Sequence, residues 1–161
     1  MNVNDDISVL QGSKNELIVF ENESDTLSFL QLLKLNSQEN NRTLITLNST
    51  VNTKKFLNTY QNFDGKVFLC LNGNKTGDTA TGKILGELQN KNIKDIRLLY
   101  GISENGHQNL SEYLQNKLQL QKKNTTLVEP KISNHANDRT QSERISDTQH
   151  LGSEFSERNS G

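Results

Sequence analysis

The sequence has too few cysteine residues for several common classes of protein. Its 161 residues include one cysteine (Cys70), one proline and no tryptophan. A single cysteine cannot form an internal disulfide, and it cannot supply the several thiolates of a cysteine-based structural zinc site. The three histidines show no metal-ligand spacing. Disulfide-stapled secreted domains and cysteine-based zinc domains are therefore excluded.

Long apolar runs and an excess of positive charge are also missing. The longest apolar runs, 17–20 and 67–71, are far shorter than the roughly 20 residues that span a bilayer. The acidic N-terminus lacks the pattern of a signal peptide. We therefore predict a cytoplasmic protein without a membrane partner. The formal net charge of −1 provides no global basic field, so any contact with DNA has to come from a local patch.

Asparagine is the residue type that the chain has in excess, with 22 in total. Apolar residues make up only 31% of the sequence, and just seven of them fall within residues 122–161. Such a polar segment cannot bury enough apolar area to offset the entropy lost on ordering it. The composition therefore predicts one folded domain over residues 1–121 and a disordered polar tail over residues 122–161.

Within the first 121 residues, short apolar segments alternate with amphipathic ones. Strands are predicted at 17–20, 43–47, 66–71 and 95–100, with a further edge strand at 7–10. Helices are predicted at 24–35, from Asn52-Thr53 onward, at 76–90 and at 110–120. This order is typical of an α/β fold with an about four-stranded, mainly parallel sheet and helices on both faces. Because sites in such sheets form outside the carboxyl ends of the strands, the residues that follow each strand are the informative ones.

Three segments resemble motifs of the Toprim domain, which is shared by bacterial primases, topoisomerases, certain nucleases and recombination mediators. Residues 17–28 (LIVFENESDTLS) resemble the first motif, an apolar strand that ends in glutamate and leads to a helix opening with Asp-Ala-Leu-Ser. Residues 66–77 (KVFLCLNGNKTG) resemble the second motif, in which a strand ends in Asp-x-Asp. Residues 109–114 (NLSEYL) resemble the late Asp-Leu-Asn-Glu-Tyr-Leu segment of primase-like members. Residues 47–49 also fit the versions carried on bacterial mobilisable elements. The resemblance covers roughly residues 7–120 and implies a Rossmann-like Toprim domain.

The resemblance implies Mg²⁺-dependent phosphoryl transfer, in which a glutamate acts as general acid or base and aspartates hold the ion. Mg²⁺ prefers oxygen ligands in octahedral geometry, usually including carboxylates. Glu21 matches the family's glutamate, and Asp25 is a further candidate ligand. Asn72, Asn74 and Asn109 stand where the family has aspartates, and an amide oxygen brings no charge to the ion. The expected metal site is therefore degenerate, and Mg²⁺ binding is in doubt.

Each of these positions also has an ordinary structural interpretation. Asparagine is common in turns, which suits Asn72 before a glycine. Asn109 with Glu112 three residues later is typical of a helix N-cap with a capping-box partner. Lys75 and Lys83 are candidate phosphate contacts, although solvated helix charges are at least as good an interpretation of both. The argument for a site is that three asparagines coincide with three expected carboxylate positions.

Two functions follow as hypotheses. The first is a catalytically degenerate Toprim-like module that binds DNA or a partner protein in primase-like replication or mobilisation machinery. The second is an active Mg²⁺-dependent enzyme on DNA, such as a primase, nuclease or topoisomerase-like catalyst, with a weakened metal site. An unrelated flavodoxin-like or nucleotide-binding module is a third, weaker alternative. The Toprim resemblance predicts that Glu21 meets Asn72 and Asn74 at adjacent strand ends.

Overall fold

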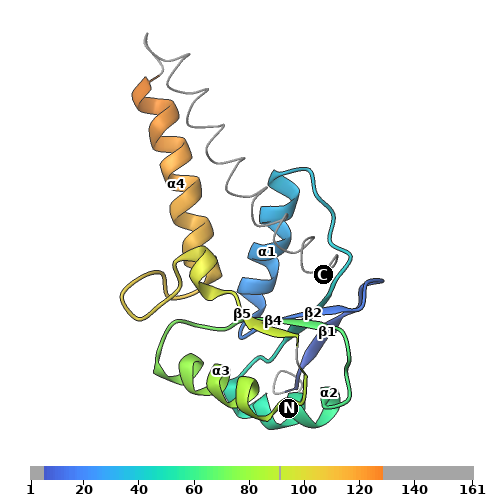
Figure 1. The fold of residues 1–161 in the computed structure, drawn as a ribbon. Coiled ribbons are helices and arrows are strands. Elements are labelled where there is room, and N and C mark those ends of the chain that lie inside the picture. The colour runs from blue at the N-terminus through green and yellow to red at the C-terminus, as the bar shows by residue number, and fades with distance from the viewer. Residues whose placement is uncertain (1–5, 91, 129–161) are drawn as a thin grey trace.

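The computed structural model of the protein describes residues 6–90 and 92–128 (Figure 1). A five-stranded sheet forms its centre, with the strands in the order β1-β3-β2-β4-β5. The strands are β1 (Ser8–Leu10), β2 (Glu16–Phe20), β3 (Thr43–Thr46), β4 (Lys66–Cys70) and β5 (Ile93–Asp95). All neighbouring strands pair in parallel except β1, which lies antiparallel to β3 at one edge. The predicted α/β fold is confirmed. The edge strand predicted at 7–10 is present as β1, and it brings the number of strands in the described sheet to five.

Helices cover both faces of the sheet. In Figure 1, α1 (Glu23–Leu35) and α4 (Leu110–Val128) lie on one side, and α2 (Thr53–Tyr60) and α3 (Lys75–Glu87) lie on the other. Every residue of β2 is therefore buried, and alternate side chains enter two separate cores. Ile18 and Phe20 join the core beneath α1 and α4, whereas Leu17 and Val19 join the core beneath α2 and α3.

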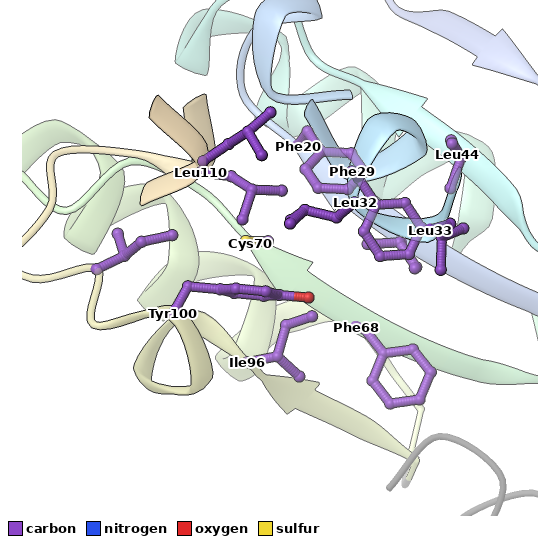
Figure 2. Packing of buried hydrophobic residues seen from close by; sticks show 13 residues of the cluster. Phe20, Phe29, Leu32, Leu33, Leu44, Phe68, Cys70, Ile96, Tyr100 and Leu110 are labelled. Carbon is purple, nitrogen blue, oxygen red and sulfur yellow. The ribbon is translucent and has the colours of Figure 1, made fainter. Parts of the chain in front are cut away.

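The core beneath α1 and α4 is rich in aromatic side chains (Figure 2). Phe20 packs against Phe29 of α1 with ring centroids 5.5 Å apart. Tyr100 packs edge-on against Tyr113 of α4 at 5.2 Å. Cys70 is buried in the same core, and burial raises the pKa of its thiol. These contacts hold the carboxyl ends of β2 and β4 against the helices that begin beside them.

The predicted position of the last strand, 95–100, is wrong. β5 ends at Asp95, and residues 97–100 form the 3₁₀ turn η3 (Arg97–Tyr100). The strand ends there because the Asp95 carboxylate accepts a hydrogen bond from the backbone N–H of Arg97 at 3.1 Å, which closes a local turn. Gly101 follows with a left-handed φ of 63°, a conformation that favours glycine.

Other boundaries also differ from the predictions. α3 ends at Glu87 rather than at 90, because Leu88 is extended and the Asn90 amide donates to the backbone carbonyls of Phe63 and Gly65. Asn52 does not cap a helix with its side chain, which donates instead to the carbonyl of Leu47 at 2.8 Å. The short 3₁₀ turn η2 (Thr50–Asn52) precedes α2 instead.

The last helix is longer than predicted. α4 continues to Val128, past the boundary at residue 121 that composition predicted. Residues 129–161 of the predicted disordered tail lie outside the described residues, so that prediction is not tested. Within the described ranges, no helix combines the length and apolar character needed to cross a membrane.

Candidate functional site

Glu21 and Asn72 meet at the carboxyl edge of the sheet. β2 and β4 are neighbouring parallel strands, with Phe20 beside Cys70, so the residues that follow each strand come together. The Glu21 carboxylate accepts a hydrogen bond from the backbone N–H of Asn72 at 3.1 Å. Desolvation raises the pKa of Glu21, while this hydrogen bond and the nearby Arg97 charge oppose the rise. The geometry expected from the Toprim resemblance is therefore present for this pair.

Asp25 lies close to this pair, in the first turn of α1. Its side chain is fully buried, with a relative exposure of 0%. Oδ1 accepts a hydrogen bond at 3.1 Å from the backbone N–H of Ser111, in the first turn of α4, and Oδ2 has no partner in the described part of the chain. Burial raises the pKa of Asp25 to about 6, and the neighbouring Glu21 charge adds to the rise. Asp25 therefore joins the starts of two helices through a carboxyl group whose pKa is raised by burial.

Asn74 and Asn109 are both helix N-caps. Asn74 Oδ1 accepts from the backbone N–H of Gly77 at 2.8 Å at the start of α3. Asn109 Oδ1 accepts from the backbone N–H of Glu112 at 2.9 Å at the start of α4, and the Glu112 carboxylate accepts from Gln108. The N-cap interpretation of Asn109 is therefore confirmed, and the same interpretation applies to Asn74.

The loop that carries Asn72 and Asn74 is packed closely on its surroundings. A Cβ atom on Gly77 would lie 2.1 Å from the carbonyl oxygen of Asn72, so only glycine lets α3 approach the end of β4 this closely. Gly73 donates its N–H to the carbonyl of Gln108 at 2.8 Å. The Asn72 side chain itself is only 9% exposed, and its Oδ1 is buried without a partner among the described residues.

Arg97 is a site residue that the sequence analysis missed. Its Nη1 donates to the carbonyl of Asn72 at 3.0 Å and to Asp78 at 2.6 Å, and its Nε and Nη2 donate to Asp95. The available signal is a single basic residue inside an otherwise mostly apolar segment, residues 95–100, for which the pattern predicts a strand.

The two candidate phosphate-contacting lysines lie on α3, and both side chains are exposed. Lys75 is the first residue of the helix and lies beside the carboxyl edge. Lys83 is eight residues further on, which is about 12 Å along a helix axis. The structure therefore brings Lys75 near the candidate site and leaves Lys83 away from it.

The donor set does not fit the magnesium site of the family. Among the residues that the structure describes, no three His, Cys, Asp or Glu side chains gather where they could hold a metal ion. The oxygens of Asn74 and Asn109 accept helix N–H groups, and the other terminal atom of each amide is an NH₂ nitrogen, which repels a cation. An aspartate in the same position would keep a second oxygen. Glu21 and Asp25 are the two carboxylates that remain.

Comparisons with known proteins give a family match and two similar structures. A family model described as Toprim-like matches residues 18–114. The primase fragment of the bacteriophage T7 primase-helicase protein has a TM-score of 0.51 at 17% identity, covering 73% of this chain and 46% of that chain. A structure of bacteriophage T7 lagging-strand DNA polymerase interacting with primase domains has a TM-score of 0.46 at 14% identity, covering 68% and 54%.

The present chain thus spans about half the length of these T7 chains. No curated protein matches the sequence. The likeness to the T7 primase fragment concerns the fold, whereas the family match covers more than half of the chain. Because that match includes both strand ends that carry Glu21 and Asn72, the protein belongs to the Toprim-like family.

Proposed function

We propose that this Toprim-like domain acts in DNA metabolism as a binding module, for DNA or for a protein of replication or mobilisation machinery, and that it has lost metal-dependent catalysis. The observation that carries the proposal is the use of Asn74 and Asn109 as helix caps. The single oxygen of each amide accepts a hydrogen bond from a backbone N–H, and neither side chain has a second oxygen that could bind an ion.

The charge of the site supports the same proposal. Asparagine at positions 72, 74 and 109 removes three negative charges relative to the family pattern. Mg²⁺ sheds its water reluctantly and relies on carboxylates and substrate phosphates to hold it. Asp25 is engaged with the start of α4, and burial raises the pKa of this carboxyl. Glu21 alone is a poor anchor for the ion.

The class of process rests on the family and on the fold shared with a phage primase fragment. A module without chemistry acts through its surface. Lys75 at the start of α3 is the candidate phosphate contact beside the edge. The alternative, an active enzyme with a weakened site, differs in one measurable respect, because it requires Mg²⁺ to bind and Glu21 to be essential.

The test is calorimetric titration of Mg²⁺ and Mn²⁺ into the full chain and into the N72D/N74D variant. We expect no tight binding to the natural chain and roughly tenfold or greater tightening in the variant, since two charges are added at the strand end. The matched control is N58D/N62D, which adds two charges at exposed positions on and just after α2. This control should bind no more tightly than the natural chain.

Primer-synthesis and nicking assays complete the test. The natural chain should be inactive in both assays, with or without Mg²⁺. Tight Mg²⁺ binding together with an activity that E21A abolishes would overturn the proposal and establish the enzyme instead. If N72D/N74D also binds no metal, the site geometry assigned to these strand ends is wrong.

A further inference from the structure

Arg97 connects three elements around the loop that carries Asn72. Its guanidinium pairs with both oxygens of Asp95 at the end of β5 and with Asp78 in the first turn of α3. The same group donates to the carbonyl of Asn72 just after β4. The side chain is only 13% exposed, so it forms part of the packed edge. A guanidinium carries five N–H donors in a rigid plane, which suits it to hold several acceptors at once.

The Asn72 backbone is held from two sides. Its N–H donates to Glu21, and its carbonyl accepts from Arg97. In the family pattern this loop follows the strand that bears the metal carboxylates. Here a fixed side-chain cation contacts the loop, and its position requires no bound ion.

Arg97 also sets the charge of the edge. Arginine stays protonated at all physiological pH values. Its charge lowers the pKa of Glu21, against the rise from burial, and it directly neutralises Asp78 and Asp95. Without it, three acidic side chains near one strand end would lack their shared cation, and the edge would attract divalent ions more strongly.

From these contacts we infer that Arg97 is a positioning residue that takes over the organising role of the metal: it holds the Asn72 loop and opposes the binding of divalent cations. This inference rests on the proposed loss of metal-dependent catalysis. It adds that the edge has gained its own cation as well as losing three carboxylates. It predicts that metal affinity and loop stability depend on Arg97 in opposite directions.

The experiment places R97M and R97K in the N72D/N74D background and measures Mn²⁺ affinity by calorimetry and thermal unfolding by circular dichroism. In this background, R97M should bind Mn²⁺ roughly tenfold more tightly than N72D/N74D alone, because a repelling charge is removed and the carboxylates of Asp78 and Asp95 lose their cation. R97K should keep the weak affinity of the parent, since the charge remains. Both variants should melt at a lower temperature, because neither has the planar set of donors.

A purely structural role for Arg97 predicts a different pattern, with Mn²⁺ affinity unchanged or weakened in a folded R97M. That result would overturn the inference. If R97M fails to fold, R97Q in the same background decides the matter, because glutamine removes the charge and keeps a side-chain N–H donor. Tighter Mn²⁺ binding in N72D/N74D/R97Q supports the inference, and unchanged or weaker binding contradicts it. Tight Mg²⁺ binding with catalysis by the natural chain would instead refute the proposed function, so the two failures are distinguishable.

Discussion

The buried acidic side chains at the two ends of the parallel strands have different partners. At the amino ends, Glu16 of β2 is 3% exposed and forms an ion pair with Arg42 at 2.8 Å, and Lys14 lies 3.9 Å away. At the carboxyl ends, Glu21 and Asp25 accept backbone N–H groups, and neither forms an ion pair in the described part of the chain. The buried acid of the amino edge is therefore paired, whereas Glu21 and Asp25 lie outside the ion pairs that Arg97 forms with Asp78 and Asp95 at the carboxyl edge.

This difference separates an edge whose charges stabilise the fold from the edge where the Toprim resemblance predicts the site residues. Charges that only stabilise a fold are paired when they are buried, because an unpaired buried charge is costly. Groups with perturbed pKa values cluster at functional sites instead. Burial raises the pKa of both Glu21 and Asp25 at the carboxyl edge. Buried atoms without a described partner occur at both edges, since Glu16 Oε2 and Lys66 Nζ at the amino edge share this property with Asp25 Oδ2 and Asn72 Oδ1 at the carboxyl edge. The raised pKa values are therefore what distinguishes the carboxyl edge.

Breaking the amino-edge pair should give the largest effect. In R42M, Glu16 stays buried with only Lys14 at 3.9 Å, and removing one partner of a buried pair costs up to roughly 3–5 kcal/mol of unfolding free energy. Urea denaturation monitored by circular dichroism measures the loss. Because the change lies at the opposite edge from Glu21, Mn²⁺ affinity in the N72D/N74D background should stay the same.

The matched control is E16Q/R42M, which removes both charges. We expect it to recover most of the stability lost in R42M, since the cost comes from the Glu16 carboxylate that is left buried without Arg42. Equal destabilisation of R42M and E16Q/R42M would mean that the packing of Arg42, rather than its charge, holds this edge. The amino edge would then not be the neutralised counterpart of the carboxyl edge.

The second prediction concerns the carboxyl edge and its pH dependence. Folding raises the pKa of Asp25 from 3.8 to about 6, so the folded state binds this proton more tightly than the unfolded state. The contribution of Asp25 to stability is therefore fully present below pH 3.8 and is lost as the pH rises through about 6. The total change is about 2–3 kcal/mol.

D25N removes this titration and keeps an oxygen that can accept from Ser111. Urea denaturation of both proteins between about pH 4 and pH 7 should show the natural chain losing stability relative to D25N as the pH rises. A stability difference that stays constant over this range would show that Asp25 is ionised throughout. Its carboxylate would then be compensated in the same way as the amino-edge acid.

Much of the fold could be predicted from the sequence because the parallel sheet leaves a simple pattern. Continuous apolar runs such as 17–20 mark strands that are covered on both faces, and the residues after them mark the functional edge. The meeting of Glu21 and Asn72 follows from two neighbouring parallel strands, so a pair of local motifs was sufficient. The family match confirms the Toprim resemblance on which this geometry rested.

The features that escaped prediction depend on contacts between distant residues. The segment 95–100 has the composition of a strand, but Asp95 bonds to the Arg97 backbone and ends the strand early. Arg97 then contacts Asn72 and Asp78, which are 25 and 19 residues away in sequence. The burial of Asp25 at the start of α4 likewise joins residues 86 apart. No local sequence pattern predicts such contacts, and the surroundings of Asn72 depend on them.

The smallest expected effect tests whether the fold itself needs asparagine at the carboxyl edge. N74A removes the side-chain cap of α3 and should cost about 1 kcal/mol of unfolding free energy, measured by urea denaturation. N74D should stay within roughly 0.5 kcal/mol of the natural chain, because aspartate caps helices as well as asparagine does and its charge suits a helix N-terminus. N109A and N109D should repeat this pattern for α4. If the aspartate variants are as stable as predicted, the fold accepts the family's residues, and stability does not require asparagine at these positions. If the aspartate variants are as unstable as the alanine variants, repulsion from Glu21, Asp25 and Asp78 outweighs the gain from capping. The asparagines would then be part of how this edge tolerates its remaining acids without a metal.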